Sequence, residues 1–303
     1  MLTVLALGGN ALLAPGERGT AAEQRANLRA TLRGCRGLFR AGPVVITHGN
    51  GPQVGNELLR QEVAREEAPP LPLYLAVAQT QAEIGALIAA ELRAAVEEPA
   101  VVVLTHVLVD GADPAFADPT KPVGPFYSEE RARELARERE WAVREDSQRG
   151  WRRVVPSPRP LRVLEIGAVR TLLGDGAVVV AVGGGGIPVV ERDGAYDGVD
   201  AVIDKDHASA LLAKELGAER LVILTQVPAV YRDFESETRT RVAELSPGRD
   251  DAILAGLPPG SMRPKVEAAF DFVRATGGEA LITSAEALEN GEAGTRIAPA
   301  SRP

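Results

Sequence analysis

The chain has 303 residues, of which 45% are apolar and 25% are charged, a composition typical of globular proteins. Its 42 acidic and 34 basic residues give a formal net charge of −8. No long basic run stands among them, so we expect no nucleic-acid partner. No unbroken apolar run reaches the roughly 18 residues of a membrane span, so we expect no membrane association. The single cysteine, Cys35, excludes an internal disulfide and favours a reducing, cytoplasmic location.

Apolar runs and helical patterns alternate through the first third of the chain. Thr20 and Glu23 are spaced as a helix capping box. In order, the pattern predicts a strand at Thr3–Leu7, a helix from Thr20 to about Arg40, a strand at Pro43–Thr47, helices at Asn56–Glu67 and Leu73–Val96, and a strand at Ala100–Val109.

Residues 111–160 interrupt this alternation. They hold prolines throughout, a highly charged helical pattern from about Ser128 to Glu140, and two aromatic-bearing segments, Trp141–Glu145 and Trp151–Val155. We expect a small helix-plus-hairpin subdomain that projects from the main sheet and moves as a lid, because its Pro-rich hinges and few long apolar runs indicate a small core weakly tied to that sheet.

The alternation resumes after residue 160. It predicts helices at Glu165–Leu173, His207–Leu216 and Met262–Ala275, strands at Val178–Val182, Leu221–Thr225 and Glu279–Thr283, and a hairpin at Val189–Tyr196. Short β-branched runs between amphipathic helices are typical of buried parallel strands. The sequence therefore predicts an α/β fold, with a mainly parallel open sheet between two layers of helices.

Three glycine-rich turns directly follow predicted strands: Gly8-Gly9-Asn10, Gly49-Asn50-Gly51 and Gly183–Gly186. In an open α/β sheet, the turns at the carboxyl ends of the strands form the ligand crevice. Glycine lets backbone N–H groups approach an anion closely. Together the three turns predict an anion site at this edge, and His48, just before the second turn, is a candidate lining residue.

Lysine is scarce, because only four of the 34 basic residues are lysines. Lys121, Lys205 and Lys265 lie in loops rich in Gly, Pro or Asp, whereas Lys214 lies within a predicted helix. Lysine offers a compact ammonium that arginine cannot replace beside a phosphate. Asp204 and Asp206 flank Lys205 and could position it, help bind Mg²⁺, or cap the next helix, a role for which Asp206 is the better placed.

Other phosphate and nucleotide motifs fit less well. No lysine stands in a Walker-type phosphate loop, and there is no GxSxG or HExxH motif. Gly49, Gly51 and Gly55 are spaced one residue wider than a dinucleotide fingerprint, which leaves an NAD(P)-binding oxidoreductase as a weak alternative. A catalytically silent nucleotide sensor is another, although the loop lysines argue against it.

Six segments, in this order along the chain, resemble the carbamate kinases of the amino acid kinase superfamily. They are HGNGPQVG from His48, DPAFADPTKPVGPFY from Asp113, RRVVPSP from Arg152, VGGGGIPV from Val182, VIDKD from Val202, and GSMRPKVEA from Gly260. The resemblance covers nearly the whole chain. An acetylglutamate- or aspartate-type kinase of the same superfamily is the alternative.

The resemblance implies an αβα sandwich and an enzyme of arginine metabolism that interconverts ATP plus carbamate with ADP plus carbamoyl phosphate, using Mg²⁺ as a homodimer. Residues 1–175, including 111–160, would bind carbamate, and 176–303 would bind the nucleotide. The catalytic residues implied are Asn10, Lys121, Lys205, Asp206 and Lys265. Those implied for the phosphoryl group and carbamate are Gly8, Gly9, Gly49, Asn50 and Gly51. Those implied for the nucleotide are Gly184, Gly185, Asp204, Thr225, Val227, Tyr231, Ser261 and Met262.

Overall fold

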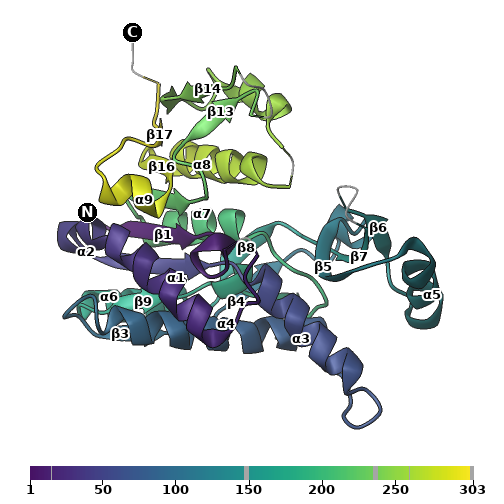
Figure 1. Ribbon diagram of the computed structural model, residues 1–303. Coiled ribbons are helices and arrows are strands. Elements are labelled where there is room, and N and C mark those ends of the chain that lie inside the picture. Colours follow the sequence, from purple (N-terminus) through teal and green to yellow (C-terminus); the bar gives the residue numbers. More distant parts are fainter. Residues whose placement is uncertain (15, 147–149, 235–237, 259, 301–303) are drawn as a thin grey trace.

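The central sheet of the computed structural model runs through strands from both ends of the chain. The structure describes residues 1–14, 16–146, 150–234, 238–258 and 260–300. Within these, eight strands pair in the order β15-β17-β16-β12-β1-β2-β9-β3 (Figure 1). Neighbouring strands are parallel except β16 and β17. Their bounds are β1 Thr3–Leu7, β2 Val44–His48, β3 Ala100–Val102, β9 Val178–Val180, β12 Arg220–Leu224, β15 Glu244–Leu245, β16 Glu279–Thr283 and β17 Thr295–Ile297.

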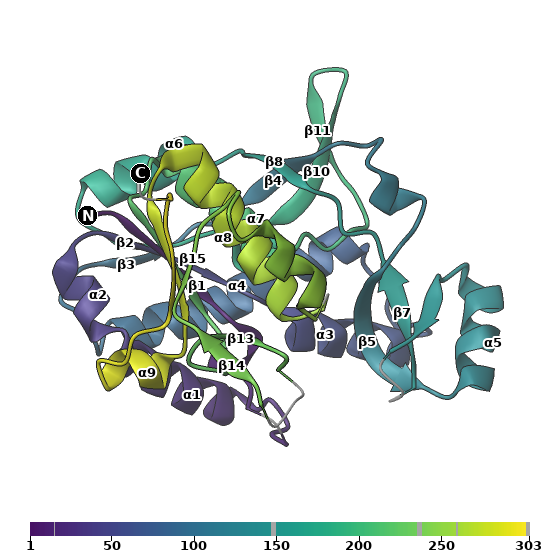
Figure 2. The same ribbon diagram turned by 90° about the horizontal axis from the view of Figure 1, so that it is seen from above.

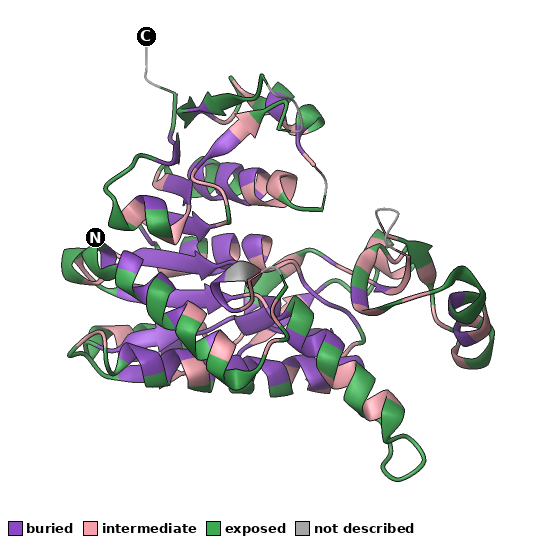
Figure 3. Ribbon diagram, viewed as in Figure 1, coloured by how far each residue is buried: buried purple, intermediate pink, exposed green. Residues whose placement is uncertain are grey.

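Alternate residues of β1 point to two different cores, one on each face of the sheet. Val4 and Ala6 pack in a core that contains residues of α7 (Lys205–Leu216) and α8 (Met262–Thr276). Leu5 and Leu7 pack in the other core, with α1 (Ala21–Gly34) and α4 (Leu73–Leu92). This is the two-residue period of a strand buried on both faces, and the central strands are buried along their length (Figure 3). The predicted αβα sandwich is confirmed.

Helix α4 is apolar enough to need comment. Among the described residues it is the one helix with the length and composition to cross a membrane. Its Ile84, Ile88 and Leu92 are fully buried against the sheet. Length and composition are weak evidence for a span when half of the helix is buried, and α4 is a core helix of the sandwich.

Two predicted elements are each divided in the structure. The helix expected from Thr20 to Arg40 ends at Gly34, and α2 (Arg36–Ala41) follows after a break at Cys35. The strand expected at Ala100–Val109 is two strands in different sheets. β3 pairs with β9, whereas β4 (His106–Val109) joins a second sheet of order β11-β10-β4-β8. The change of sheet occurs at Thr105, whose N–H donates to the side chain of Gln81.

The second sheet carries the predicted hairpin. The hairpin consists of β10 (Ile187–Arg192) and β11 (Ala195–Gly198). The outer strand on the other side of this sheet is β8 (Pro160–Val163). Asp193 and Gly194 form its turn with φ of 50° and 79°, the left-handed pair that a tight hairpin needs. The hairpin stands out from the body of the molecule (Figure 2). The remaining elements are α6 Ile166–Gly174, α9 Ala285–Glu289, and a two-stranded sheet of β13 Val230–Arg232 and β14 Thr240–Val242.

Residues 111–160 form a projecting subdomain, as expected (Figures 1 and 2). Helix α5 (Glu129–Arg139) lies beside an antiparallel sheet of order β5-β7-β6. The strands are β5 Lys121–Tyr127, β6 Val143–Glu145 and β7 Trp151–Val155. β5 lies against α3 (Gly51–Val63), where a Cβ at Gly55 would stand only 3.3 Å from the Gly124 Cα. The subdomain is thus joined to the main body next to a predicted glycine turn.

Candidate active site

The turns after three neighbouring strands, β12, β1 and β2, meet at the carboxyl edge of the central sheet. Gly8 lies so close to β12 that a Cβ there would come within 2.8 Å of the Leu224 carbonyl oxygen. A Cβ at Gly49 would lie 3.9 Å from the Gly9 nitrogen and 3.3 Å from Cδ of Lys205. Two of the three glycine turns and one scarce lysine are therefore adjacent, although they come from distant parts of the chain.

Asp206 joins two of the lysines. Its Oδ1 is 2.6 Å from Lys205 Nζ, and its Oδ2 is 3.1 Å from Lys265 Nζ. The carboxylate is 4% exposed, and the two lysine side chains are 13% and 15% exposed. A single buried carboxylate therefore holds two ammonium groups, one from the start of α7 and one from the first turns of α8.

The electrostatics of this cluster follow from burial and pairing. Burial raises the pKa of Asp206, but Lys205 and Lys265 lower it by more, so the net pKa lies below its usual value. Burial lowers the pKa of Lys205, and the ion pair with Asp206 opposes part of that fall. The carboxylate is therefore ionised at neutral pH, as two neighbouring ammonium groups require.

Asp204 anchors the third lysine. Its Oδ2 is 2.8 Å from Lys121 Nζ of the subdomain, and its Oδ1 accepts a hydrogen bond of 2.9 Å from the Asp206 backbone N–H. Burial raises the pKa of Asp204, but Lys121 lowers it well below its usual range. The helix was expected to begin at His207 with Asp206 as its cap. It begins at Lys205 instead, and Asp204 caps it, which leaves the Asp206 carboxylate to the lysines.

A pocket of about 280 Å³ opens beside Lys265. Five of the residues predicted for the nucleotide line it: Thr225, Val227, Tyr231, Ser261 and Met262. Gly8, Gly9 and Lys265 lie at the same pocket, so its wall is continuous with the glycine turn and the lysine cluster. The sequence reasoning missed the other lining residues, which are Leu224, Gln226, Phe234, Leu257, Pro258 and Gly260. Their only signal was proximity in the sequence to the predicted residues.

The third glycine turn lies on the other side of the cluster. Gly184 has φ of 65°, and a Cβ there would fall 2.3 Å from Nδ2 of Asn50, so only glycine fits. Gly185 packs against the backbone of Ile203, just before Asp204. Gly184, Gly185 and Asp204 are not among the lining residues of the 280 Å³ pocket. The structure therefore places them beside Asn50 and Lys205 rather than with the other residues predicted for the nucleotide.

The remaining predicted residues are at the edges of the turns. Gly51 begins helix α3. Asn10 belongs by its backbone to a short 3-10 turn at Gly9–Ala11, and its side chain lies outside what the structure describes. His48 is fully buried at the end of β2 and is not among the lining residues of the 280 Å³ pocket. It lies between two glycine turns, because a Cβ at Gly183 would come within 2.3 Å of its Nε2, and its lining of the anion site stays a prediction.

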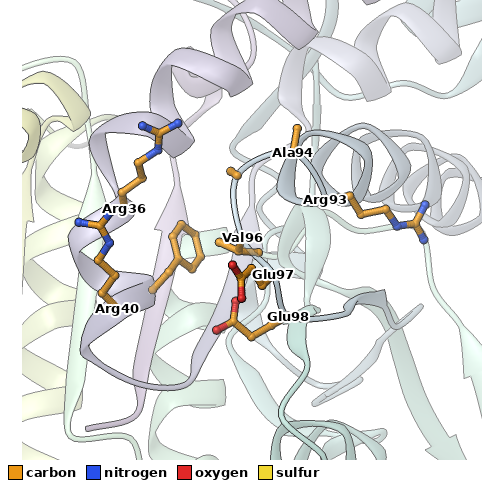
Figure 4. A pocket seen from close by; sticks show the side chains of 9 residues that line it. Arg36, Arg40, Arg93, Ala94, Val96, Glu97 and Glu98 are labelled. Carbon is orange, nitrogen blue, oxygen red and sulfur yellow. The ribbon is translucent and has the colours of Figure 1, made fainter.

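A larger cavity, of about 580 Å³, lies elsewhere on the molecule (Figure 4). It is formed by α2 and by the loop after α4, which precede β2 and β3, and so it is at the amino ends of those strands. Arg36, Arg40 and Arg93 lie at its edge with Glu97 and Glu98. None of the predicted site residues lines it, and the carboxyl edge remains the candidate active site.

No cluster of three or more His, Cys, Asp or Glu side chains that could hold a metal ion occurs in the described part of the chain. Both oxygens of Asp204 and both of Asp206 already accept from an N–H or an ammonium group. This donor set does not build a cation site of its own. A divalent ion would have to arrive with oxygen ligands supplied by the substrate.

Together, the parallel sandwich, the glycine turns at its carboxyl edge and the lysine cluster define a class of phosphate-handling α/β enzymes. Residues 1–284 match the amino acid kinase family, and the chain belongs to it. The chain is 44% identical to the carbamate kinase of Pyrococcus horikoshii and 45% identical to that of Halobacterium salinarum, over 98% of each chain. The structure of the Giardia lamblia carbamate kinase bound to AMP-PNP superposes with a TM-score of 0.89, at 40% identity over 98% of each chain. Within the amino acid kinase family, the chain is therefore a member of the carbamate kinases.

Proposed function

We propose a mechanism for the carbamate kinase activity that family membership gives this enzyme. In it, the γ-phosphoryl group passes directly and in line between ATP and carbamate, giving ADP and carbamoyl phosphate, or the reverse. The observation that carries it is the pair of ammonium groups, Lys205 and Lys265, held on one buried carboxylate between a glycine turn and a pocket. This arrangement supplies positive charge at the point where phosphate oxygens would meet.

The site needs no general base. Carbamate is already an anion, so its oxygen can attack without losing a proton. The difficulty is to bring it against a more negative phosphate, and catalysis of such a transfer is mainly positioning and charge neutralisation. Lys205 lies against Gly49, on the carbamate side, and Lys265 lines the nucleotide-side pocket. The two lysines would thus stabilise the phosphoryl group from both sides during transfer.

The other predicted residues would complete the cradle. Backbone N–H groups of Gly8, Gly9, Gly49 and Gly51, with Asn10 and Asn50, would surround the phosphoryl group and carbamate. Lys121 would act from the subdomain, and its ion pair with Asp204 already brings it to the cluster. Thr225, Val227, Tyr231, Ser261 and Met262 would hold the nucleotide base and ribose, with Gly184, Gly185 and Asp204 behind the phosphates.

Mg²⁺ would enter as part of the nucleotide substrate. The carboxylates of Asp204 and Asp206 are occupied by lysines and a backbone N–H, so the phosphate oxygens and water would be its ligands. Mg²⁺ commonly keeps several waters and binds through substrate phosphates. The ion would supply further charge neutralisation, and the lysines would supply the part that belongs to the protein.

We also propose the division of the chain and its assembly. Residues 1–175, with the subdomain at 111–160, would bind carbamate, and 176–303 would bind the nucleotide, although β9 of the second part pairs between β2 and β3 of the first. A homodimer is supported by the outer face of α4, where Ala78, Ala82, Ala86 and Ala90 recur every four residues and are exposed or half-buried. Small residues at this spacing allow two helices to approach closely. A cytoplasmic location accords with the buried free thiol of Cys35.

A coupled assay tests the function directly. With ADP, Mg²⁺ and carbamoyl phosphate, we expect ATP formation, detected through hexokinase and glucose-6-phosphate dehydrogenase. Acetyl phosphate in place of carbamoyl phosphate is the control for a generic acyl phosphate. In the opposite direction, acetylglutamate and aspartate are offered with ATP. Activity on either of these, with none on carbamoyl phosphate, would refute the substrate assignment.

A further inference from the structure

Helix α4 contributes two consecutive polar side chains, Thr80 and Gln81, that contact the glycine turns of the candidate active site. Each is 1% exposed, and the helix is otherwise largely apolar on the side that faces the core. Buried polar groups of this kind persist only where their hydrogen bonds are satisfied. The partners of these two side chains are two of the three glycine turns.

Thr80 holds the turn at Gly49–Gly51. Its hydroxyl donates to the Ala76 carbonyl oxygen at 2.9 Å and accepts from Nδ2 of Asn50 at 3.0 Å. Asn50 stands at the N-cap of α3, a position where an asparagine side chain ordinarily bonds to the first turn of its own helix. Here it makes no capping bond. Pro52 at N2 has no N–H to donate, and the Asn50 amide nitrogen donates to Thr80 instead. The conformation of this turn therefore depends on a hydroxyl from another helix.

Gln81 holds the turn at Gly183–Gly186. Its Nε2 donates to the Gly183 carbonyl oxygen at 3.0 Å, and its Oε1 accepts from the Thr105 N–H at 2.6 Å. The two turns also touch each other, since Gly184 packs directly on the Asn50 amide. Thr80 and Gln81 are consecutive residues, so any shift of α4 moves both turns together.

We propose that Thr80 and Gln81 are positioning residues for phosphoryl transfer, which hold the turns at Gly49–Gly51 and at Gly183–Gly186 in one rigid arrangement. The proposal rests on the role proposed above for Asn50 and its turn. Neither residue lines the 280 Å³ pocket proposed for the base and ribose, so their loss would act at the phosphate end of the site. Loss of Thr80 would move the Asn50 turn, and loss of Gln81 would move the turn that carries Gly184 and Gly185. A misplacement of about 1 Å at a transfer site can lower turnover about a hundredfold.

The test uses near-isosteric variants of the full-length enzyme. Thr80→Val removes the hydroxyl and keeps the shape, Thr80→Ser restores the hydroxyl, and Gln81→Glu removes the N–H groups that reach Gly183. Gln79→Glu makes the same chemical change at an exposed position of α4 and is the matched control. For each we measure kcat and KM for carbamoyl phosphate, the ADP dissociation constant by calorimetry, and the melting temperature.

We expect Thr80→Val and Gln81→Glu to lower kcat at least tenfold. ADP should bind Thr80→Val within about twofold of wild type, whereas Gln81→Glu should also weaken ADP binding, because the turn it holds carries Gly184 and Gly185. Thr80→Ser should recover most of the turnover, and Gln79→Glu should match wild type. A double-mutant cycle with Asn50→Ala should be non-additive, because Thr80 acts through Asn50. Should Thr80→Val not fold, the comparison of Thr80→Ser with Thr80→Ala replaces it.

Two results would overturn the proposal: folded Thr80→Val and Gln81→Glu with turnover within twofold of wild type, or additive effects in the cycle with Asn50. Failure of the wild type to use carbamoyl phosphate would be a separate result, since it refutes the proposed substrate. The variants would then be compared by the same kcat and KM measurements on whichever phosphoryl acceptor the wild type uses.

Discussion

Replacing the site lysines by arginine would separate charge from shape at the active site. Lys205→Arg and Lys265→Arg keep the positive charge but replace a compact ammonium with a planar, bulkier fork. Lys205 lies against the turn at Gly49–Gly51: a Cβ on Gly49 would stand 3.3 Å from the Lys205 Cδ. The Lys205 side chain is 13% exposed. A guanidinium therefore cannot take the place of the ammonium without moving the turn or breaking the bond to Asp206.

The magnitude follows from what each lysine supplies. Loss of one well-placed donor to the transferring group costs on the order of 10²–10³ in kcat, or about 3–4 kcal/mol of transition-state stabilisation. We expect a loss of that size in each variant while the protein still folds, because a positive charge remains beside Asp206. The melting temperature of Lys205→Arg should fall only modestly, by the cost of fitting the bulkier side chain against the Gly49 turn. The assay is turnover at saturating ADP and carbamoyl phosphate, with thermal melting measured on the same samples.

Lys214→Arg is the matched control. Lys214 belongs to the same helix as Lys205 but is exposed near its other end, so the substitution should leave turnover within about twofold. The reasoning would be refuted if Lys214→Arg were as damaging as the other two, or if Lys205→Arg and Lys265→Arg kept near-normal turnover.

Four further outcomes are expected. Asp206→Asn leaves two buried ammonium groups without their carboxylate and should cost about 3–5 kcal/mol in urea unfolding; a loss under 1 kcal/mol would contradict the pairing. Burial lowers the pKa of His48 from 6.5 to about 4. The contribution of neutral His48 to the free energy of unfolding is therefore fully present above pH 6.5. It is lost, by up to about 3 kcal/mol, as the pH falls from 6.5 to 4. His48→Gln should therefore flatten unfolding free energy against pH in that window, and an unchanged profile would refute this. Amides of 111–160 should exchange faster than those of the central strands and slow with ADP plus phosphonoacetamide; equal, unchanged protection would exclude a lid. Ala86→Arg on the outer face of α4 should shift sedimentation from dimer to monomer, whereas an unaltered mass would place the interface elsewhere.

The sheet and its helices could be predicted because their signals are local. The capping box at Thr20 and Glu23 is present with both of its hydrogen bonds, and the turn at Asp193 and Gly194 forms as its residues require. The change of sheet at Thr105 could not be foreseen, because the Thr105 N–H donates there to the side chain of Gln81, 24 residues away, instead of to a neighbouring strand. The strand propensity of residues 100–109 therefore predicted one continuous strand where the structure has β3 and β4.

The site divides in the same way. Scarce lysines and glycine turns after strands carried enough chemical identity to be picked out one by one, and the structure brings Lys121, Lys205 and Lys265 to the same pair of aspartates. Of the two aspartates considered as caps, Asp206 was thought the better placed, but Asp204 caps the helix; both are equally good caps by type. In the structure Asp204 accepts the capping bond from the Asp206 N–H, and both oxygens of Asp206 accept from lysines.

The hydrogen bonds of this cluster explain how lysines can be fixed by a carboxylate and still serve a phosphate. An ammonium has three N–H donors. Among the described residues, Lys205 donates one hydrogen bond, to Asp206. Lys265 donates two, one to Asp206 and one to the Ser261 carbonyl oxygen. Two donors on Lys205 and one on Lys265 remain for substrate oxygens, in directions set before the substrate arrives. Because the orienting bonds need not break on binding, the cluster is preorganised for the transition state. Asp206 therefore determines where the charge lies, and in the proposed mechanism the lysines would stabilise the phosphoryl group as it moves.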